Sequence, residues 1–157
     1  MDSTTHLLDL KLADGQEKQA SIDVSVSISN FDHLPSSERV IELVQRVLEG
    51  ESAPFESIGI ILADHETVLE LNRTWLEHDF HTDVLSFLIE DDPRHLEGEV
   101  YVDVETAEER HQEFESTVQE EIERYIVHGL LHLVGYDDAT EAERSAMQQL
   151  ENRYATL

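Results

Sequence analysis

Residues 128–138, which read His-Gly-Leu-Leu-His-Leu-Val-Gly-Tyr-Asp-Asp, place two histidines four positions apart in an apolar helical pattern. Residues at this spacing share one face of a helix, about 5–6 Å apart at Cβ, so His128 and His132 can bind one ion. The second glycine permits the left-handed turn that ends a helix, and the chain then returns Asp137 or Asp138 toward the same point. Two histidines and one carboxylate form a three-ligand zinc set with an open position, which is typical of a catalytic metal.

The residues between and after the two histidines are apolar, which predicts a largely buried helix. They are Leu130, Leu131, Leu133 and Val134. A bare pair of histidines at this spacing is common on helices that bind no metal. An imidazole without a partner is costly in a buried helix, so the setting favours metal ligands.

The pattern HxxxHxxGxxD also overlaps that of metzincin-type peptidases, in which a glutamate follows the first histidine and acts as the general base. That position is Gly129 in this chain. The sequence therefore argues against proteolysis.

Upstream and downstream of this helix, segments with a period of two alternate with segments of helical period. Strands are predicted over residues 21–28, 57–63, 82–89 and 98–104, and helices over 35–50, 64–76, from 105, over 117–134 and from 140. The pattern indicates an α/β or α+β domain with a mixed four-stranded sheet covered by helices. Of the two we expect α+β, with a zincin-like metal helix carrying His128 and His132. We expect one domain over residues 1–157, with residues 1–19 irregular.

The chain has 157 residues and a formal net charge of −26, from 36 acidic and 10 basic residues. Such a surface repels phosphate backbones, so composition alone disfavours nucleic acid as a partner. The acidity suits either a salt-rich cytoplasm, which screens self-repulsion, or simply a highly soluble surface. No cysteine is present, which excludes thiolate chemistry. The sequence lacks an apolar run of about 18 residues and a signal-peptide pattern, so we expect a cytoplasmic protein.

Residues 128–138 resemble the hallmark HGxLHLxGYDH of the YbeY family, bacterial single-strand-specific metallo-endoribonucleases, and match it through Asp137. The family's TDVLSF strand stands at residues 82–87, and Gly98-Glu99-Val100 is similar to its Gly-Asp-Ile strand. Met147 also falls where the family usually has methionine. The likeness extends from about residue 58 to the C-terminus.

The resemblance implies a metal site formed by His128, His132 and Asp138, which stands where the family has a third histidine. Carboxylate oxygen binds zinc at about the same distance as imidazole nitrogen, so a zinc site survives the change, although another divalent metal is also compatible. The family's arginine that is thought to hold phosphate is replaced by Leu76. Arg73, one helical turn earlier, is our candidate phosphate contact; its alternative role is a solvated helix residue.

The resemblance also implies hydrolysis of single-stranded RNA, in maturation of the 3′ end of small-subunit ribosomal RNA and in ribosome quality control. The expected partners are therefore RNA and the small ribosomal subunit with its proteins. An RNA-facing edge is predicted where basic and protonatable groups gather, at Arg73, His78, His81, Arg94 and His95. Two alternatives stay open: a metal hydrolase of a non-RNA substrate, and a ribosome-associated binding module with a structural metal.

Four further polar residues have candidate roles in such a site. Asp137 and Glu121 are candidate carboxylates that orient a histidine N–H, with surface or capping roles as the alternative. Asp83 and Ser86 point to opposite faces of their strand, so one of them can face the cleft; a structural role is the alternative.

Overall fold

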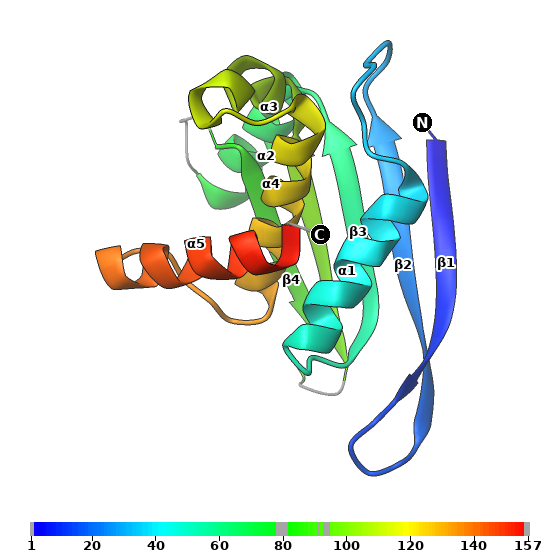
Figure 1. Cartoon of the computed structure of the whole chain (residues 1–157). Coiled ribbons are helices and arrows are strands. Elements are labelled where there is room, and N and C mark those ends of the chain that lie inside the picture. The colour runs from blue at the N-terminus through cyan, green and yellow to red at the C-terminus, as the bar shows by residue number, and fades with distance from the viewer. Residues whose placement is uncertain (1, 78–81, 91, 93–94, 156–157) are drawn as a thin grey trace.

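One mixed sheet forms the centre of the computed structural model, which describes residues 2–77, 82–90, 92 and 95–155. Its strands are β1 (Asp2–Lys11), β2 (Glu17–Ser27), β3 (Phe55–Ala63), β4 (Val84–Glu90) and β5 (Leu96–Asp103). They lie in the order β1-β2-β3-β5-β4 (Figure 1). β2, β3 and β5 are mutually parallel, whereas the edge strands β1 and β4 run antiparallel to their neighbours.

The predicted α+β class is confirmed, but the sheet has five strands where four were expected. The expectation that residues 1–19 are irregular was also wrong, because β1 pairs with β2 from Asp2 opposite Val26 to Lys11 opposite Glu17. β1 is an edge strand: Leu8 and Leu10 are only partly buried, and Leu7 is exposed. Its sequence therefore carries little of the period-two pattern that marks a half-buried strand.

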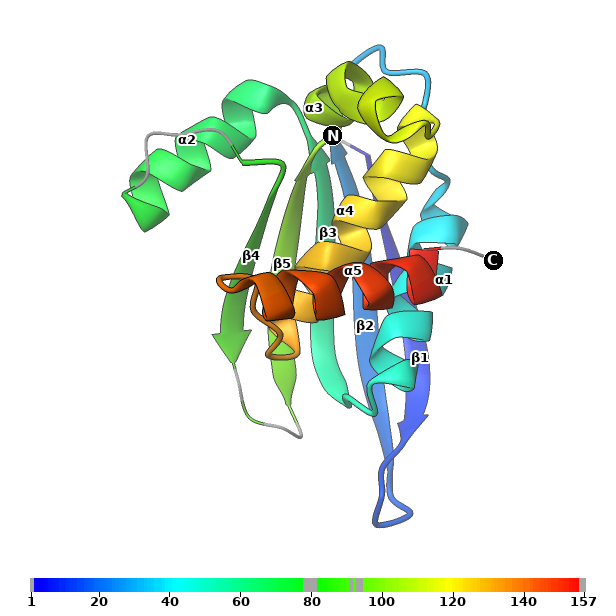
Figure 2. The ribbon, with the colours of Figure 1, turned by 60° about the vertical axis from the view of Figure 1, so that its left-hand side comes forward.

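Helices cover both faces of this sheet. They are α1 (Ser37–Gly50), α2 (His65–Leu76), α3 (Val104–Arg110), the short 3-10 helix η1 (His111–Phe114), α4 (Val118–Leu133) and α5 (Glu141–Ala155). The main core lies between the sheet and α1 and α4, whereas α2 packs against a smaller cluster on the opposite face (Figure 2). None of the described helices is long and apolar enough to cross a bilayer.

The alternation of side chains along each strand divides these two clusters. Val100 and Val102 of β5 point toward α4, while Tyr101 between them packs against the α2 cluster. In β4, Val84 belongs to the main core and Leu85 to the smaller cluster. At these positions of β4 and β5, even-numbered residues therefore face α4 and odd-numbered residues face α2.

α4 approaches the sheet so closely at Gly129 that no side chain fits there. A Cβ at this position would lie 2.4 Å from Cγ1 of Val100 and 3.0 Å from Cγ2 of Val84. The hydroxyl of Ser86 donates to the carbonyl oxygen of Gly129 at 2.8 Å and joins β4 to the helix. At its start the helix has a capping box formed by Thr117 and Glu120. The prediction of a helix over 117–134 is therefore confirmed, and its contact with the sheet depends on a glycine.

Replacing Gly129 with alanine should destabilise the protein. Alanine favours a helix interior over glycine by about 1 kcal/mol. Overpacking against the valines opposes this gain and costs about 1–3 kcal/mol or more, so we expect a net loss in the free energy of unfolding, measured by denaturant titration.

Gly59→Ala is the matched control, because a Cβ there would first meet the flexible Glu99 side chain at 3.4 Å. This variant should be as stable as the wild type or slightly more so. A Gly129→Ala variant more stable than the wild type would contradict the close contact.

Candidate metal centre

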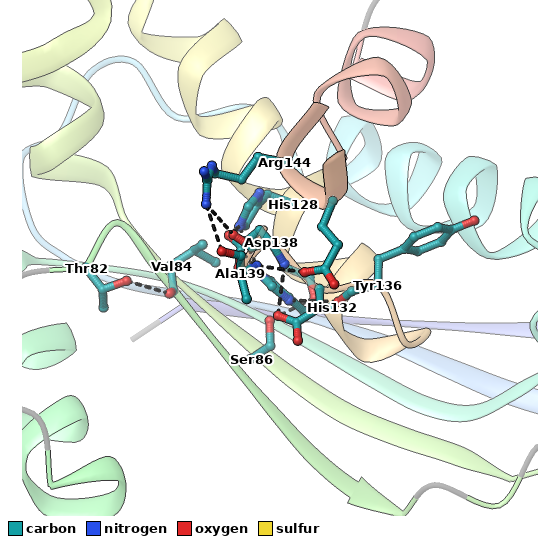
Figure 3. Close-up of polar contacts among 12 residues, drawn as sticks. Thr82, Val84, Ser86, His128, His132, Tyr136, Asp138, Ala139 and Arg144 are labelled. Carbon is teal, nitrogen blue, oxygen red and sulfur yellow. Dashed lines mark hydrogen bonds and ion pairs between the residues drawn. The ribbon is translucent and has the colours of Figure 1, made fainter. Parts of the chain in front are cut away.

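His128 and His132 lie on the last two turns of α4, and Asp138 lies on the loop that follows, so that three donor atoms converge (Figure 3). The two Nε2 atoms are 3.0 Å apart. Oδ2 of Asp138 lies 3.4 Å from Nε2 of His128 and 3.7 Å from Nε2 of His132. The structure thus brings together the three residues that the sequence analysis singled out.

The other nitrogen of each ring is held by a hydrogen-bond acceptor. Nδ1 of His128 lies 3.2 Å from a carboxylate oxygen of Glu151 on α5. Nδ1 of His132 lies 3.0 Å from the carbonyl oxygen of Tyr136. These acceptors favour the tautomer in which Nδ1 carries the proton. The unprotonated Nε2 atoms of the two rings then face each other and are free to bind a metal.

These separations fit a divalent ion. Ligands bonded at about 2.0–2.1 Å in a tetrahedron are about 3.3 Å apart. The three measured separations, 3.0, 3.4 and 3.7 Å, lie around this value. The side chains of His128, His132 and Asp138 keep 21, 28 and 40 % exposure, so the cluster is open to solvent on one side. The donor set therefore fits a metal with an accessible fourth position.

The loop after α4 turns back at Gly135, whose φ is +108°. The amide of Tyr136 donates to the carbonyl oxygen of Leu131 at 3.0 Å, which returns the chain toward the helix. Asp137 accepts a hydrogen bond from the amide of Asp138, so its carboxylate serves the turn. Of the two aspartates that the sequence left open, Asp138 is the one whose carboxylate lies beside the histidines.

The carboxylates around His128 raise the pKa of its imidazole. Burial by itself acts in the opposite direction and is the largest single influence. The hydrogen bond to Glu151 and the charges of Glu151, Asp83 and Asp138 together outweigh it. The same concentration of negative charge attracts a divalent cation.

Glu151 was missed by the sequence analysis. It lies on α5, four residues after the buried Met147, so the two share the helix face that packs toward α4. That spacing was the available signal, but nothing in the sequence says which helix α5 contacts.

The other candidate residues have separate places. Ser86 on β4 donates a hydrogen bond to the backbone of α4 at Gly129, whereas Asp83 lines a pocket beside His128. Glu121 is buried in α4, lines the same pocket and accepts a hydrogen bond from the Ser116 hydroxyl at 3.0 Å. Its side chain is thus tied to the start of the helix.

The predicted RNA-facing edge is not brought together around the cluster. Arg73 lies on α2, on the opposite face of the sheet, 4.0 Å from Glu70. His95 contacts Lys18 and Glu56. The remaining members, His78, His81 and Arg94, lie outside the described residues.

A family model described as Endoribonuclease YbeY matches residues 17–156. The chain belongs to the YbeY family. It is 45% identical to the Endoribonuclease YbeY of Salinibacter ruber over 120 residues, which cover 71% of this chain and 76% of that one. It is 33% identical to the Endoribonuclease YbeY of Chloroherpeton thalassium over 133 residues, 85% of this chain and 93% of that one.

A solved structure is similar to this YbeY chain as well. The solution structure of TM1509 from Thermotoga maritima superposes with a TM-score of 0.59 at 29% identity, covering 85% of this chain and 86% of that one. The fold described above is thus shared with an experimentally determined structure.

Glu151→Gln should weaken metal binding without removing a ligand. The amide oxygen still accepts a hydrogen bond, but the negative charge behind His128 is lost. Changes of this kind typically cost about 10–100-fold in metal affinity. Competition with a chromogenic chelator measures the dissociation constant.

Glu141→Gln, at the exposed other end of α5, removes the same charge and should leave the dissociation constant unchanged. Equal affinities of the two variants would show that Glu151 does not support the site.

Proposed function

We propose that this YbeY family member is a metal-dependent endoribonuclease that hydrolyses phosphodiester bonds of single-stranded RNA. His128, His132 and Asp138 would hold the ion. The observation that carries the proposal is the convergence of two Nε2 atoms and one carboxylate oxygen within 4.8 Å of one another. The relatives named Endoribonuclease YbeY support the choice of RNA as substrate.

The metal in this proposal is zinc, and the carboxylate of Asp138 widens the choice. Oxygen and nitrogen donors bind zinc at similar distances, so the ligand set remains suitable for it. A harder oxygen ligand also suits manganese or magnesium better than three imidazoles do. A bound divalent ion would supply two effects: it lowers the pKa of water and stabilises negative charge on phosphoryl oxygens.

The protein's own groups prepare the site for that ion. Glu151 and the carbonyl oxygen of Tyr136 hold the rings of His128 and His132, so that both Nε2 atoms are available as ligands without reorganisation. The partial exposure of all three side chains leaves room for a phosphodiester to approach. The phosphate contact predicted for Arg73 remains part of this proposal.

Peptide hydrolysis is disfavoured by the packing of α4. The glutamate that serves as general base in metzincin-type peptidases would occupy position 129. That position faces Val100 and Val84 with no space for a Cβ. The side chain needed for a peptidase of this class therefore cannot be accommodated.

The biological setting is proposed from the family. We place the reaction in maturation of the small-subunit ribosomal RNA 3′ end and in ribosome quality control, hence in the cytoplasm. The net charge of −26 opposes free encounter with RNA at low salt. Delivery by the ribosome and its proteins, or high ionic strength, would overcome this repulsion. We also propose that residues 1–157 act as one domain.

Cleavage of single-stranded RNA tests the proposal. His128→Ala and His132→Ala should lose bound metal and slow cleavage by more than about 100-fold, because removing a ligand should cost more than removing its support. Asp138→Ala should behave alike, whereas Asp138→His should keep both metal and cleavage. Elemental analysis and the cleavage rate are measured on each purified variant.

His33→Ala is the control, since His33 is an exposed histidine between β2 and α1. It should retain metal and cleave at the wild-type rate. A wild-type protein that binds metal but leaves RNA intact would overturn the nuclease proposal and favour a binding module with a structural metal.

A further inference from the structure

A pocket of about 520 Å³ opens directly beside His128 and Asp138. It lies where η1, α4 and α5 meet the start of β4. Arginines, carboxylates and the ring of Tyr125 line it, together with His128 and a few neutral residues. Whatever reaches the candidate metal from this side therefore passes these side chains.

Three arginines line this pocket, Arg110, Arg124 and Arg144. The whole chain has only ten basic residues against 36 acidic ones, so cationic groups are concentrated here. Arginine recognises phosphate through its planar fork of N–H donors. The lining also holds four carboxylates, those of Asp83, Glu121, Asp138 and Glu151, so the pocket is richer in cations than the chain as a whole without being positive overall.

The three arginines differ in how far carboxylates neutralise them, and Arg110 lies 3.4 Å from the carboxylate of Glu113. Glu151 is shared by Arg124 and His128, at 3.4 and 3.2 Å. Asp138 faces the histidines, and Glu121 accepts a hydrogen bond from Ser116. Arg144 contacts none of these carboxylates.

Arg144 is held by backbone oxygens. Its Nη1 donates to the carbonyl oxygens of Ala139 at 3.0 Å and Asp138 at 3.4 Å, as Figure 3 shows. Within the described parts of the chain, no carboxylate lies within 4.0 Å of its guanidinium nitrogens. The loop that presents Asp138 thus fixes a guanidinium beside the site without neutralising it, and the remaining N–H groups stay available to a ligand.

Tyr125 provides a second, independent observation. It is only 6 % exposed, and its hydroxyl makes no well-formed hydrogen bond among the described residues, although the carboxylate of Glu121 lies close enough to interact with it. A buried hydroxyl without a partner costs free energy in the absence of a ligand. Burial, with the nearby charges of Asp83 and Glu121, raises the pKa of the phenol, so the group is a hydrogen-bond donor at neutral pH.

We propose that this pocket is the binding subsite for an RNA phosphate next to the scissile one. Arg144 is its principal cation, Arg110 and Arg124 add to the field, and the Tyr125 hydroxyl donates to a ligand oxygen. This inference rests on the proposed nuclease function. It gives the chain a phosphate contact on α5 in addition to the one proposed for Arg73 on α2.

Binding of a short fluorescent single-stranded RNA to the metal-loaded protein, followed by anisotropy before cleavage sets in, tests the subsite. Arg144→Gln should weaken binding about tenfold, the equivalent of about 1.4 kcal/mol. It should also reduce the slope of log K against log salt by about 0.7, as expected for one lost contact with a single strand. Arg144→Lys should retain most of the slope, since the charge remains.

Arg153→Gln is the matched control, because Arg153 lies on the same helix, stacks over Tyr154 and does not line the pocket. Its RNA affinity and salt slope should equal those of the wild type. Tyr125→Phe removes only the hydroxyl, so it should weaken RNA binding while leaving the free energy of unfolding unchanged or higher.

The outcomes separate this subsite from the nuclease proposal. Wild-type cleavage with unchanged RNA affinity in Arg144→Gln would overturn the subsite and leave the nuclease intact. RNA binding that depends on Arg144 without any cleavage would overturn the nuclease and retain the subsite. A wild-type protein that neither binds nor cleaves RNA would overturn both.

Discussion

The contact between α4 and the sheet at Gly129 is the constraint on which the rest of the structure depends. The backbone of α4 at Gly129 packs directly against Val100 and Val84. This contact sets the distance of the helix from the sheet, and with it the position of the neighbouring His128. His132 then follows one turn later on the same face. The helix ends at once afterwards, so the loop can bring Asp138 back to the two rings. A bulkier residue at position 129 would displace all three donors together.

Charge is arranged at two scales in this protein. The chain as a whole carries a formal charge of −26, which repels other anions. Around His128 the nearby carboxylates attract a cation, whereas the adjoining pocket gathers three arginines. A phosphodiester approaching this region would therefore meet guanidinium groups as well as carboxylates, and the bound ion would add positive charge.

The sequence predicted the parts of the site that are close together in the chain. The spacing of His128 and His132, the turn at Gly135 and the limits of α4 all follow from local rules, and the structure has them. β1 was missed because it is an edge strand in which Asp2–Thr5 are exposed and the inward-facing Leu8 and Leu10 are only partly buried, so its period-two pattern is weak. Glu151 and Arg144 could not be assigned, because their roles depend on how α5 packs across α4, a contact between distant segments.

A crystal structure of the metal-loaded protein, with anomalous scattering recorded at the metal's absorption edge, tests the central claim most directly. The account predicts one peak at about 2.0–2.2 Å from Nε2 of His128, Nε2 of His132 and a carboxylate oxygen of Asp138. A peak bound elsewhere on the chain, or a site from which Asp138 turns away toward solvent, would contradict it.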